Sequence, residues 1–303
     1  MQRRQFIRVI LGASALQIVA CGGGGSIGAV GETSAILEET QAIAGPQESS
    51  LPLLRTSTDA KQVFSASGEL RAEIDSLNHL VRVVNEDGQT VWTVGAGGPE
   101  TELNFPRHAQ FVQDGRLIVL ERGGSQLRVY GTDGASLESF GGFGSQGGEL
   151  SYPADFVLVE ESQLLYCADT LNHSVACFDL SGNFVDRFGS LGAEAGQLNG
   201  PIAIEEFQGE LYVLERGNRR FSVFTAGGQF LRHIQIGDLE PSDFIIDEEG
   251  QILLSDPTSG TLALYSLQGV FLEDLEMLDS EGHPVNLRSL TRAIDGSVLA
   301  EIG

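Results

Sequence analysis

Three features that share one spacing predict an all-β fold, a six-bladed β-propeller with four antiparallel strands in each blade. The first feature is an acidic residue that ends an apolar run, found at Asp75, Glu121, Asp169, Glu215 and Asp256. The steps between these positions are 46, 48, 46 and 41 residues. A period of roughly 40–50 residues with four short strands per unit is typical of a propeller blade.

The second and third features mark turns and strand starts in the same units. A two-residue turn recurs with the same steps, at Asp87-Gly88, Asp133-Gly134, Ser181-Gly182, Gly227-Gly228 and Gln268-Gly269. Glycine suits this turn because a two-residue hairpin requires a positive φ angle. A proline opens the first strand of four units, at Pro106, Pro153, Pro201 and Pro241. Proline is tolerated there because a first residue need not donate a hydrogen bond to the sheet.

The segment from residue 163 to residue 189 shows one unit in full. An apolar run ends at Asp169, a short polar turn leads to the run Val175–Asp179, and the Ser181-Gly182 turn leads to a third run. Strands joined in this way form an antiparallel meander. The last unit, residues 286–302, is shorter than the others. We therefore expect part of Ala29–Arg55 to add outer strands that close the last blade.

The turns and loops of these units resemble the NHL-repeat family. Asn78-His79-Leu80 spells the triplet that names the family, and Asn172-His173 repeats its first two letters. The pattern Gly-x-x-x-Gly-Glu/Gln-Leu-x-x-Pro, followed by Asp-x-x-Asn-x-x-Val, is also similar to that family. The resemblance extends from Val63 to Ile302 and departs from the family at Glu121 and Glu215, where Asp is usual. It implies a propeller of six blades, the most common number in the family.

Residues 1–20 have the features of an export signal. Arg3-Arg4 resembles the twin-arginine motif, and an apolar run from Val9 to Ala20 follows it. This run is too short to cross a bilayer as a helix, which needs roughly 20 apolar residues. Residues 18–21, which end in Cys21, resemble the lipobox of bacterial lipoproteins, in which the cysteine becomes an acylated N-terminus. An uncleaved anchor and a simple secretory signal are the alternatives.

Residues 21–60 are expected to tether a propeller domain, residues 61–303, to a membrane. Gly22–Ser26 is a flexible glycine-serine stretch, and the chain that follows is small, polar and acidic. The resemblance to lipoproteins implies a monomer anchored at the periplasmic face of a bacterial membrane. The residue that follows the cysteine is Gly22 and not Asp, which favours the outer membrane.

The overall charge excludes one class of partner. The chain has 42 acidic residues against 18 lysines and arginines, so its formal net charge is −24. Such a surface lacks the positive charge that displaces counterions from a phosphate backbone. We therefore expect no binding to nucleic acid.

A candidate metal site follows from the position two residues after the opening prolines. This position holds His108, Asp155 and Asp243. Because the first strands of propeller blades converge on a central channel, these side chains could jointly hold a cation such as calcium at the channel mouth. The alternative is structural, with each aspartate bonding to the backbone of its own blade.

Two enzyme classes have a similar fold and make this candidate worth testing. Lactone-hydrolysing propellers use a calcium ion in the channel, and peptidyl-hydroxyglycine lyases hold a zinc ion with three histidines. The repeat register does not place the other histidines beside His108, so the three-histidine zinc site is not expected. These other histidines are His79, His173, His233 and His283.

Arginines at two kinds of repeat position predict a positive patch. Arg122 and Arg216 follow the acidic position in alternate units, and Arg107 lies at the start of a first strand. Side chains of this kind bind carboxylate or phosphate groups with two parallel hydrogen bonds. The alternative is local pairing with Glu121 and Glu215.

Cys167 and Cys177 lie five residues on either side of Asn172. A hairpin centred on Asn172 would place the two cysteines opposite each other, and an exported protein meets oxidising conditions. A disulfide and a pair of buried thiols are both compatible with this spacing.

We therefore expect an exported, lipid-anchored propeller that acts as a binding scaffold in the bacterial envelope. Its partner would be an envelope protein or a small acidic ligand at the channel mouth, and calcium is the one cofactor that the residues suggest. The alternative is a metal-dependent enzyme of the lactone hydrolase or peptidyl-hydroxyglycine lyase type.

Overall fold

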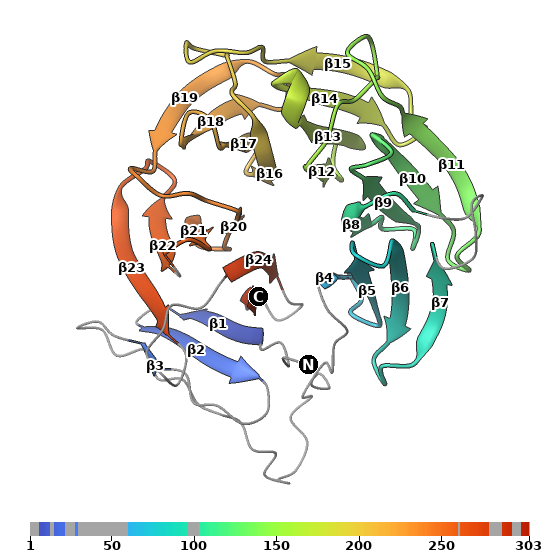
Figure 1. Cartoon of the computed structure of the whole chain (residues 1–303), viewed down its shortest axis with the longest axis horizontal. Coiled ribbons are helices and arrows are strands. Elements are labelled where there is room, and N and C mark those ends of the chain that lie inside the picture. The colour runs from blue at the N-terminus through green and yellow to red at the C-terminus, as the bar shows by residue number, and fades with distance from the viewer. Residues whose placement is uncertain are drawn as a thin grey trace, which may run out of the picture. The chain divides into compact units, whose positions relative to one another are not determined.

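The computed structural model describes residues 6–12, 15–21, 28–29, 60–95, 103–259, 261–278, 287–292 and 298–302. The chain divides into two compact units. Unit 1 comprises Met1–Thr58, Glu86–Gln89 and Glu240–Gly303, and unit 2 comprises Asp59–Asn85 and Thr90–Leu239. Figure 1 labels the strands of both units.

Unit 2 contains four antiparallel sheets, each built from four strands that follow one another in the chain. The first is β4 (Ala60–Phe64), β5 (Leu70–Asp75), β6 (Leu80–Asn85) and β7 (Thr90–Val94). The second is β8 (Pro106–Phe111), β9 (Leu117–Glu121), β10 (Gln126–Tyr130) and β11 (Ser136–Gly141). The third is β12 (Asp155–Val159), β13 (Leu164–Asp169), β14 (Ser174–Asp179) and β15 (Phe184–Phe188). The fourth is β16 (Pro201–Phe207), β17 (Glu210–Glu215), β18 (Arg220–Thr225) and β19 (Phe230–Gln235).

Unit 1 contains a fifth sheet of the same kind. Its strands are β20 (Asp243–Ile246), β21 (Gln251–Asp256), β22 (Thr261–Ser266) and β23 (Phe271–Leu278), and the short β3 (Gly28–Ala29) pairs with β23. A further sheet has the order β2-β1-β25-β24. It joins β24 (Leu287–Arg292) and β25 (Val298–Ile302) to β1 (Phe6–Gly12) and β2 (Ala15–Cys21).

The number of blades formed by consecutive strands is five, and not the six that the sequence predicted. The remaining sheet takes β24 and β25 from one end of the chain and β1 and β2 from the other, so it is not a further copy of the meander. Ala29 pairs with Met277 in β23, within the range from which a closing strand was expected. The rest of that range, residues 30–55, lies outside the described residues.

The second strands β9, β13, β17 and β21 are buried at nearly every residue, which explains their largely continuous apolar sequences. Every residue of β9 is buried, whereas the fourth strand β11 is exposed or half-buried along its whole length. A strand covered on both sides loses the alternation of apolar and polar residues that marks a half-buried strand. The blades therefore place their apolar surface against the neighbouring blades.

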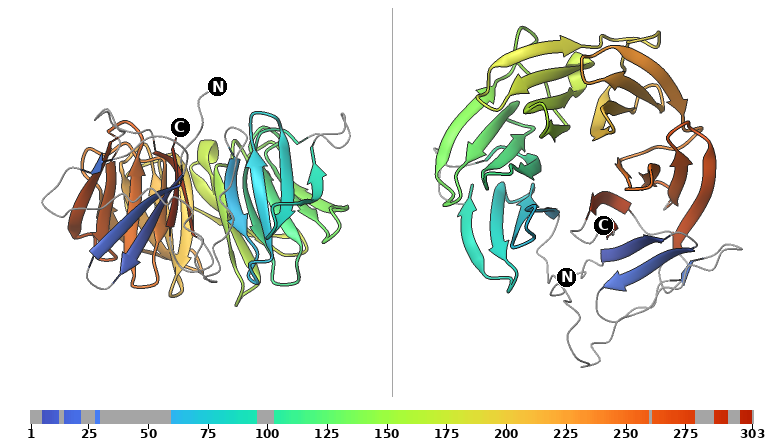
Figure 2. Two further views of the ribbon diagram at one scale, coloured as in Figure 1. Left: turned by 90° about the horizontal axis from the view of Figure 1, so that it is seen from below. Right: turned by 180° about the vertical axis from the view of Figure 1, so that it is seen from behind.

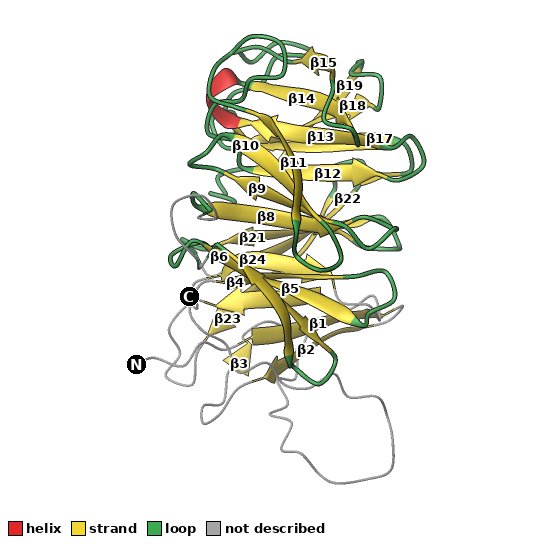
Figure 3. Ribbon diagram, turned by 90° about the vertical axis from the view of Figure 1, so that its right-hand side faces the viewer, coloured by secondary structure: helices red, strands yellow, loops and turns green. Residues whose placement is uncertain are grey.

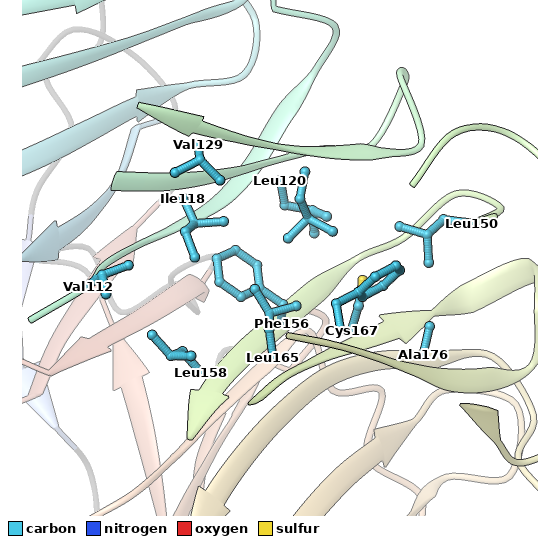
Figure 4. Close-up of a cluster of buried hydrophobic side chains, with 12 residues drawn as sticks. Val112, Ile118, Leu120, Val129, Leu150, Phe156, Leu158, Leu165, Cys167 and Ala176 are labelled. Atoms are coloured by element: carbon cyan, nitrogen blue, oxygen red, sulfur yellow. The ribbon is translucent and has the colours of Figure 1, made fainter. Parts of the chain in front are cut away.

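The core between the second and third blades shows this packing directly. Side chains from β9 and β10 meet side chains from β12, β13 and β14, as Figure 4 shows. Phe156 lies among the labelled aliphatic side chains in that view, and it is 1% exposed. At about 25 cal/mol per Å² of apolar surface, burial of this kind supplies most of the stability of a blade interface.

A second contact between blades repeats at the outer edge of unit 2. An aromatic residue of one fourth strand packs on the glycine of the two-residue turn in the next blade. The pairs are Trp92 with Gly134, Phe140 with Gly182, and Phe188 with Gly228. A Cβ atom added at Gly182 would lie 2.7 Å from the Phe140 ring, so the glycine provides both a φ of +72° and the space for the ring.

Loops and turns lie at both ends of the strands, so that each blade of unit 2 has two loop-bearing faces (Figure 2). The one helix in the described part of the chain is η1 (Thr170–Asn172), a single 3-10 turn between β13 and β14 (Figure 3). Within the same part of the chain, no helix is long and apolar enough to span a membrane.

Candidate functional site

The acidic residue that ends each second strand ties its blade together. Asp169 is fully buried, and its carboxylate accepts hydrogen bonds from the Ser151 backbone N–H at 2.7 Å and from the Asn172 side chain at 2.7 Å. Glu121 accepts from the Asn104 N–H at 2.8 Å, and Glu215 accepts from the Asn199 N–H at 2.7 Å. These backbone donors lie in the loop before the first strand, whereas Asn172 lies in the turn that follows Asp169. The repeated acidic residues are architectural.

Each of these carboxylates also pairs with an arginine of its own blade. Arg187 donates to Asp169 at 2.6 Å, and Arg220 donates to Glu215 at 2.7 Å. Arg128 pairs with Glu121. Burial raises the pKa of Glu121 and of Asp169 despite these bonds. The carboxylates next to Arg122 and Arg216 in the sequence are therefore occupied by other arginines, and the local pairing considered for them is not formed.

One face of unit 2, which we name the turn face, gathers the turns between second and third strands and the loops that lead into first strands. Hydrogen bonds join the two within each blade: Arg122 N–H to Phe105 O at 3.0 Å, and Arg216 N–H to Gly200 O at 3.1 Å. Because both kinds of segment lie at the same end of the strands, their side chains share one surface.

Three arginines come together on the turn face. Arg122 places its guanidinium carbon 4.8 Å from the centroid of the Tyr152 ring, which belongs to the next blade. Burial lowers the pKa of Arg122, and the nearby positive charges of Arg107 and Arg216 lower that pKa further, against a raising effect of Tyr152. The structure thus brings together the three arginines that the sequence singled out.

None of these three arginines forms an ion pair with a carboxylate among the described residues. Arg107 and Arg216 are exposed, and the Nε atom of Arg122 is buried without a hydrogen-bond partner in the described part of the chain. Arginines usually find acidic partners on a protein with a net charge of −24. Their lack of partners here marks a surface with unused capacity for an anion.

Large apolar side chains are also exposed on the turn face. Their exposed fractions run from 49% to 80%, and the residues are Leu77, Phe105, Phe143, Tyr152, Leu171 and Leu191. Contiguous exposed apolar surface on a soluble protein commonly marks an interaction site. Phe105 and Tyr152 were not among the predicted site residues, although each directly precedes an opening proline, where the fourth blade has Gly200. A bulky residue in place of this glycine was the available signal in the sequence, and the structure shows that both residues have a φ above +50°.

Hydroxyl groups take the place of the arginines in the other two blades. Ser76 donates to the backbone oxygen of Pro106, and Thr170 donates to that of Pro201 at 2.8 Å. The residue after the acidic position is therefore a link to the next blade in two blades and a cation in the other two.

His108 and Asp155 are brought together across neighbouring first strands. The Nδ1 atom of His108 lies 3.1 Å from Oδ1 of Asp155, and both side chains are largely buried. The other carboxylate oxygen of Asp155 accepts a hydrogen bond from the Ile204 N–H at 3.1 Å. Asp155 thus links three consecutive blades, instead of bonding within its own blade as the structural alternative supposed.

Asp243, the third proposed calcium ligand, lies in unit 1. Its Oδ2 atom accepts from the Leu290 N–H at 3.1 Å, and its Oδ1 atom accepts from the Phe244 N–H at 3.0 Å. The described residues contain no group of three His, Cys, Asp or Glu side chains arranged to hold a metal ion. Asp155 and Asp243 thus both accept hydrogen bonds from backbone N–H groups.

The remaining histidines of the described chain have backbone or side-chain partners. The Nδ1 atoms of His79 and His173 accept hydrogen bonds from Phe105 N–H at 3.1 Å and Gly200 N–H at 3.0 Å, each in the next blade. His233 lies 3.0 Å from the Ser222 hydroxyl. His283 lies outside the described residues.

Cys167 and Cys177 are buried free thiols that the structure does not bring together. Cys167 is opposite Ala176 and Cys177 is opposite Tyr166, because the strands pair from Asp169 and Ser174 onward. The two side chains consequently lie on opposite faces of the sheet, in the cores on either side of the blade. Burial raises the pKa of Cys177 to about 11.

The predicted lipidation site and tether are only partly described. Residues 6–12 and 15–21, which include most of the predicted export signal, form β1 and β2, and β1 pairs with β25. Cys21 is the last residue of β2, so cleavage before it would remove β1 and all of β2 except this residue. Residues 22–27 and 30–59 lie outside the described residues.

Comparisons with known proteins support the fold class and the repeat type. No protein-family profile matches the chain. Two NHL-repeat proteins match by sequence: Protein brain tumor of Drosophila melanogaster, 29% identical over 119 residues, and RING finger protein nhl-1 of Caenorhabditis elegans, 39% identical over 88 residues. These matches cover 38% and 28% of this chain. They span only 11% and 9% of the length of the relatives.

Solved structures with a similar fold include two antibiotic lyases. A streptogramin B lyase has a TM-score of 0.62 at 15% identity, over 80% of this chain and 78% of that one. Virginiamycin B lyase from Staphylococcus aureus has a TM-score of 0.60 at 11% identity, over 80% and 79%. Identities this low show the fold alone, which is that of an all-β propeller with four-stranded antiparallel blades.

Proposed function

We propose that this protein is an exported, lipid-anchored binding scaffold, held on the periplasmic side of the outer membrane. Its turn face would bind an acidic segment of an envelope protein. The observation that carries this proposal is the joint presence of exposed apolar side chains and unpaired arginines on one face of an acidic unit.

The positive charge of the arginines on the turn face determines which chemical group the partner should present. Apolar side chains such as Leu171 and Phe143 supply contact area, and arginine is enriched at the centre of protein interfaces. A partner that presents carboxylates would gain from both. The NHL-repeat relatives agree with a binding role, because propellers place their function in the loops and not in the shared fold.

The test of the binding face uses photo-crosslinking in cells that express the full chain. A photo-reactive amino acid at position 171 or 143 should yield one crosslinked envelope protein. The same amino acid at position 137, an exposed residue of the outer strand β11, should not. Equal crosslinking from positions 171 and 137 would show that the turn face has no special role.

Export and anchoring are tested separately. Radiolabelled palmitate should label the wild-type chain, and Cys21→Ser should lose both the label and the membrane association, because acyl chains at one cysteine are the proposed anchor. A Cys21→Ser protein that still carries label in the membrane fraction would remove this part of the proposal.

A second candidate function is catalysis at His108. The 3.1 Å contact with Asp155 would orient the ring as in an acid-base pair, and the fold is similar to that of lyases that act on streptogramin-type antibiotics. The enzyme class considered from sequence is metal-dependent, and His108 and Asp155 are two of its three candidate metal ligands.

Product analysis decides between the two candidates. The purified chain would be incubated with a type B streptogramin and the products analysed by mass spectrometry. Linear product that disappears in His108→Ala, while His233→Ala still forms it, would favour the enzyme. Intact antibiotic after incubation with the wild-type chain would count against it.

A further inference from the structure

The surroundings of the three arginines on the turn face differ from those of three arginines of unit 2 that form ion pairs. Arg128, Arg187 and Arg220 each reach a buried carboxylate of their own blade. Arg122 instead extends across the blade boundary to the ring of Tyr152. The face of an aromatic ring stabilises a cation but leaves the N–H groups of the guanidinium free to donate.

The position of Arg122 is fixed before any ligand binds. Its backbone N–H donates to Phe105 O, and its side chain lies against Tyr152, so few rotamers remain to be lost. Preorganised donors bind an anion more tightly than mobile ones, because less side-chain entropy is lost on binding.

Like charges also gather around Arg122. Arg107 lies beside Arg122, because Phe105 O accepts the Arg122 N–H and Pro106 pairs with Glu121. The positive charges of Arg107 and of Arg216 each lower the pKa of Arg122, so each of them repels Arg122 in the free protein. An anion bound between them would relieve that repulsion and would also form charge-assisted hydrogen bonds. Glu121 and Glu215, the carboxylates next to Arg122 and Arg216 in the sequence, do not serve this purpose because they are already paired.

We propose that Arg107, Arg122 and Arg216, with the Tyr152 ring as a platform, form a specific binding site for one oxyanion group. The group is a phosphate monoester or a pair of neighbouring carboxylates on the ligand. This inference rests on the proposed binding role of the turn face and names the chemistry that the face recognises.

The test measures binding of inorganic phosphate and of citrate to the full chain at constant ionic strength, by isothermal titration and by the shift in Tm. Arg122→Gln and Arg216→Gln should each weaken binding by roughly tenfold or more, which is the effect of one charge-assisted hydrogen bond. Arg216 is exposed, so that variant should fold even if Arg122→Gln is destabilised.

Arg116→Gln is the matched control. Arg116 is in the same blade as Arg122, it pairs with Asp114 at 2.8 Å, and its replacement removes the same formal charge. Binding to this variant should equal that of the wild type. Binding of phosphate alone would assign the site to phosphorylated ligands, and binding of citrate alone would assign it to carboxylates.

Two results would overturn the inference. The first is the absence of binding of either anion to the wild-type chain. The second is an equal loss in Arg116→Gln and Arg216→Gln, which would show a general charge effect. Either result leaves the crosslinking test of the turn face intact, because apolar contacts could still hold a partner without an oxyanion site.

Discussion

At the scale of single residues, the buried carboxylates are costly to remove from water, and each compensates by forming several hydrogen bonds. Asp169 has no solvent exposure, yet it joins the loop before its blade, the turn after it and Arg187 of the fourth strand. Such a group is expensive to bury and is stable only when every oxygen is used. The stabilising contribution of Asp169 should therefore be measurable when its carboxylate is removed.

Asp169→Ala should lower the free energy of unfolding by about 3–5 kcal/mol, because it leaves Arg187 without its carboxylate and Ser151 N–H without its acceptor. Urea denaturation of the purified chain measures the change. Asp179→Ala, which removes a carboxylate from an exposed turn, is the control and should cost much less. Similar losses in the two variants would contradict the architectural role.

His233 makes a pH-dependent contribution of known sign. Burial lowers its pKa, and Arg220 lowers it further, against the raising effect of Glu215. A folded pKa below the unfolded value of about 6.5 means that its stabilising effect is present above that pH and is lost as the pH falls through the folded pKa. Wild-type stability should therefore decrease from pH 7.5 to pH 5.5 more than that of His233→Asn. Equal slopes in urea denaturation would contradict this assignment.

The candidate arginines could be predicted from sequence because they occupy equivalent positions in alternate units. Their lack of partners could not, since the pairing of Glu121 with Arg128 depends on which way two side chains turn inside a folded blade. The contacts of the candidate calcium ligands could not be predicted for a related reason. Asp155 and Asp243 each use an oxygen to accept a backbone N–H of the next sheet along the chain.

At the scale of the elements, the register of two paired strands determines which of their residues lie opposite each other. The hairpin of β13 and β14 closes at Asp169 and Ser174, so four residues form its connection and not the five that a centre at Asn172 would give. A shift of one residue moves a side chain to the other face of the sheet. The spacing of Cys167 and Cys177 could not reveal this, whereas the strands themselves were evident from their apolar runs.

The aromatic-glycine contact gives an element-scale prediction. Gly182→Ala should cost more stability than Gly209→Ala, although both glycines have a positive φ, of +72° and +81°. Gly209 has open space around its Cβ position, so Gly209→Ala should lose only the roughly 1–2 kcal/mol that corresponds to backbone strain. Gly182→Ala also meets the Phe140 ring and should lose an additional amount of about 1–3 kcal/mol. Thermal denaturation that ranks the two variants equally would contradict the contact.

At the scale of the whole molecule, the repeat and the fold class were evident from spacing alone, and the number of blades was not. Five meanders are each marked by an acidic residue that ends an apolar run and by a glycine turn between the third and fourth strands. The last stretch of chain has only the acidic marker, Glu301, which lies 301 − 256 = 45 residues after Asp256. Of its two strands, β25 pairs with β1, which lies almost 300 residues away: 298 − 9 = 289 for the pair Val9 and Val298. Pairing over that separation leaves no local pattern.

The alternation of cations and hydroxyl links makes a pair of unlike blades the repeating unit of the turn face. Asp75 and Asp169 are 169 − 75 = 94 residues apart, and Glu121 and Glu215 are 215 − 121 = 94 residues apart. Ser76 matches Thr170 in its link to the next proline, as Arg122 matches Arg216. A protein of this kind that is lengthened by one such pair would keep every kind of junction between blades, whereas a single added blade would create a new one.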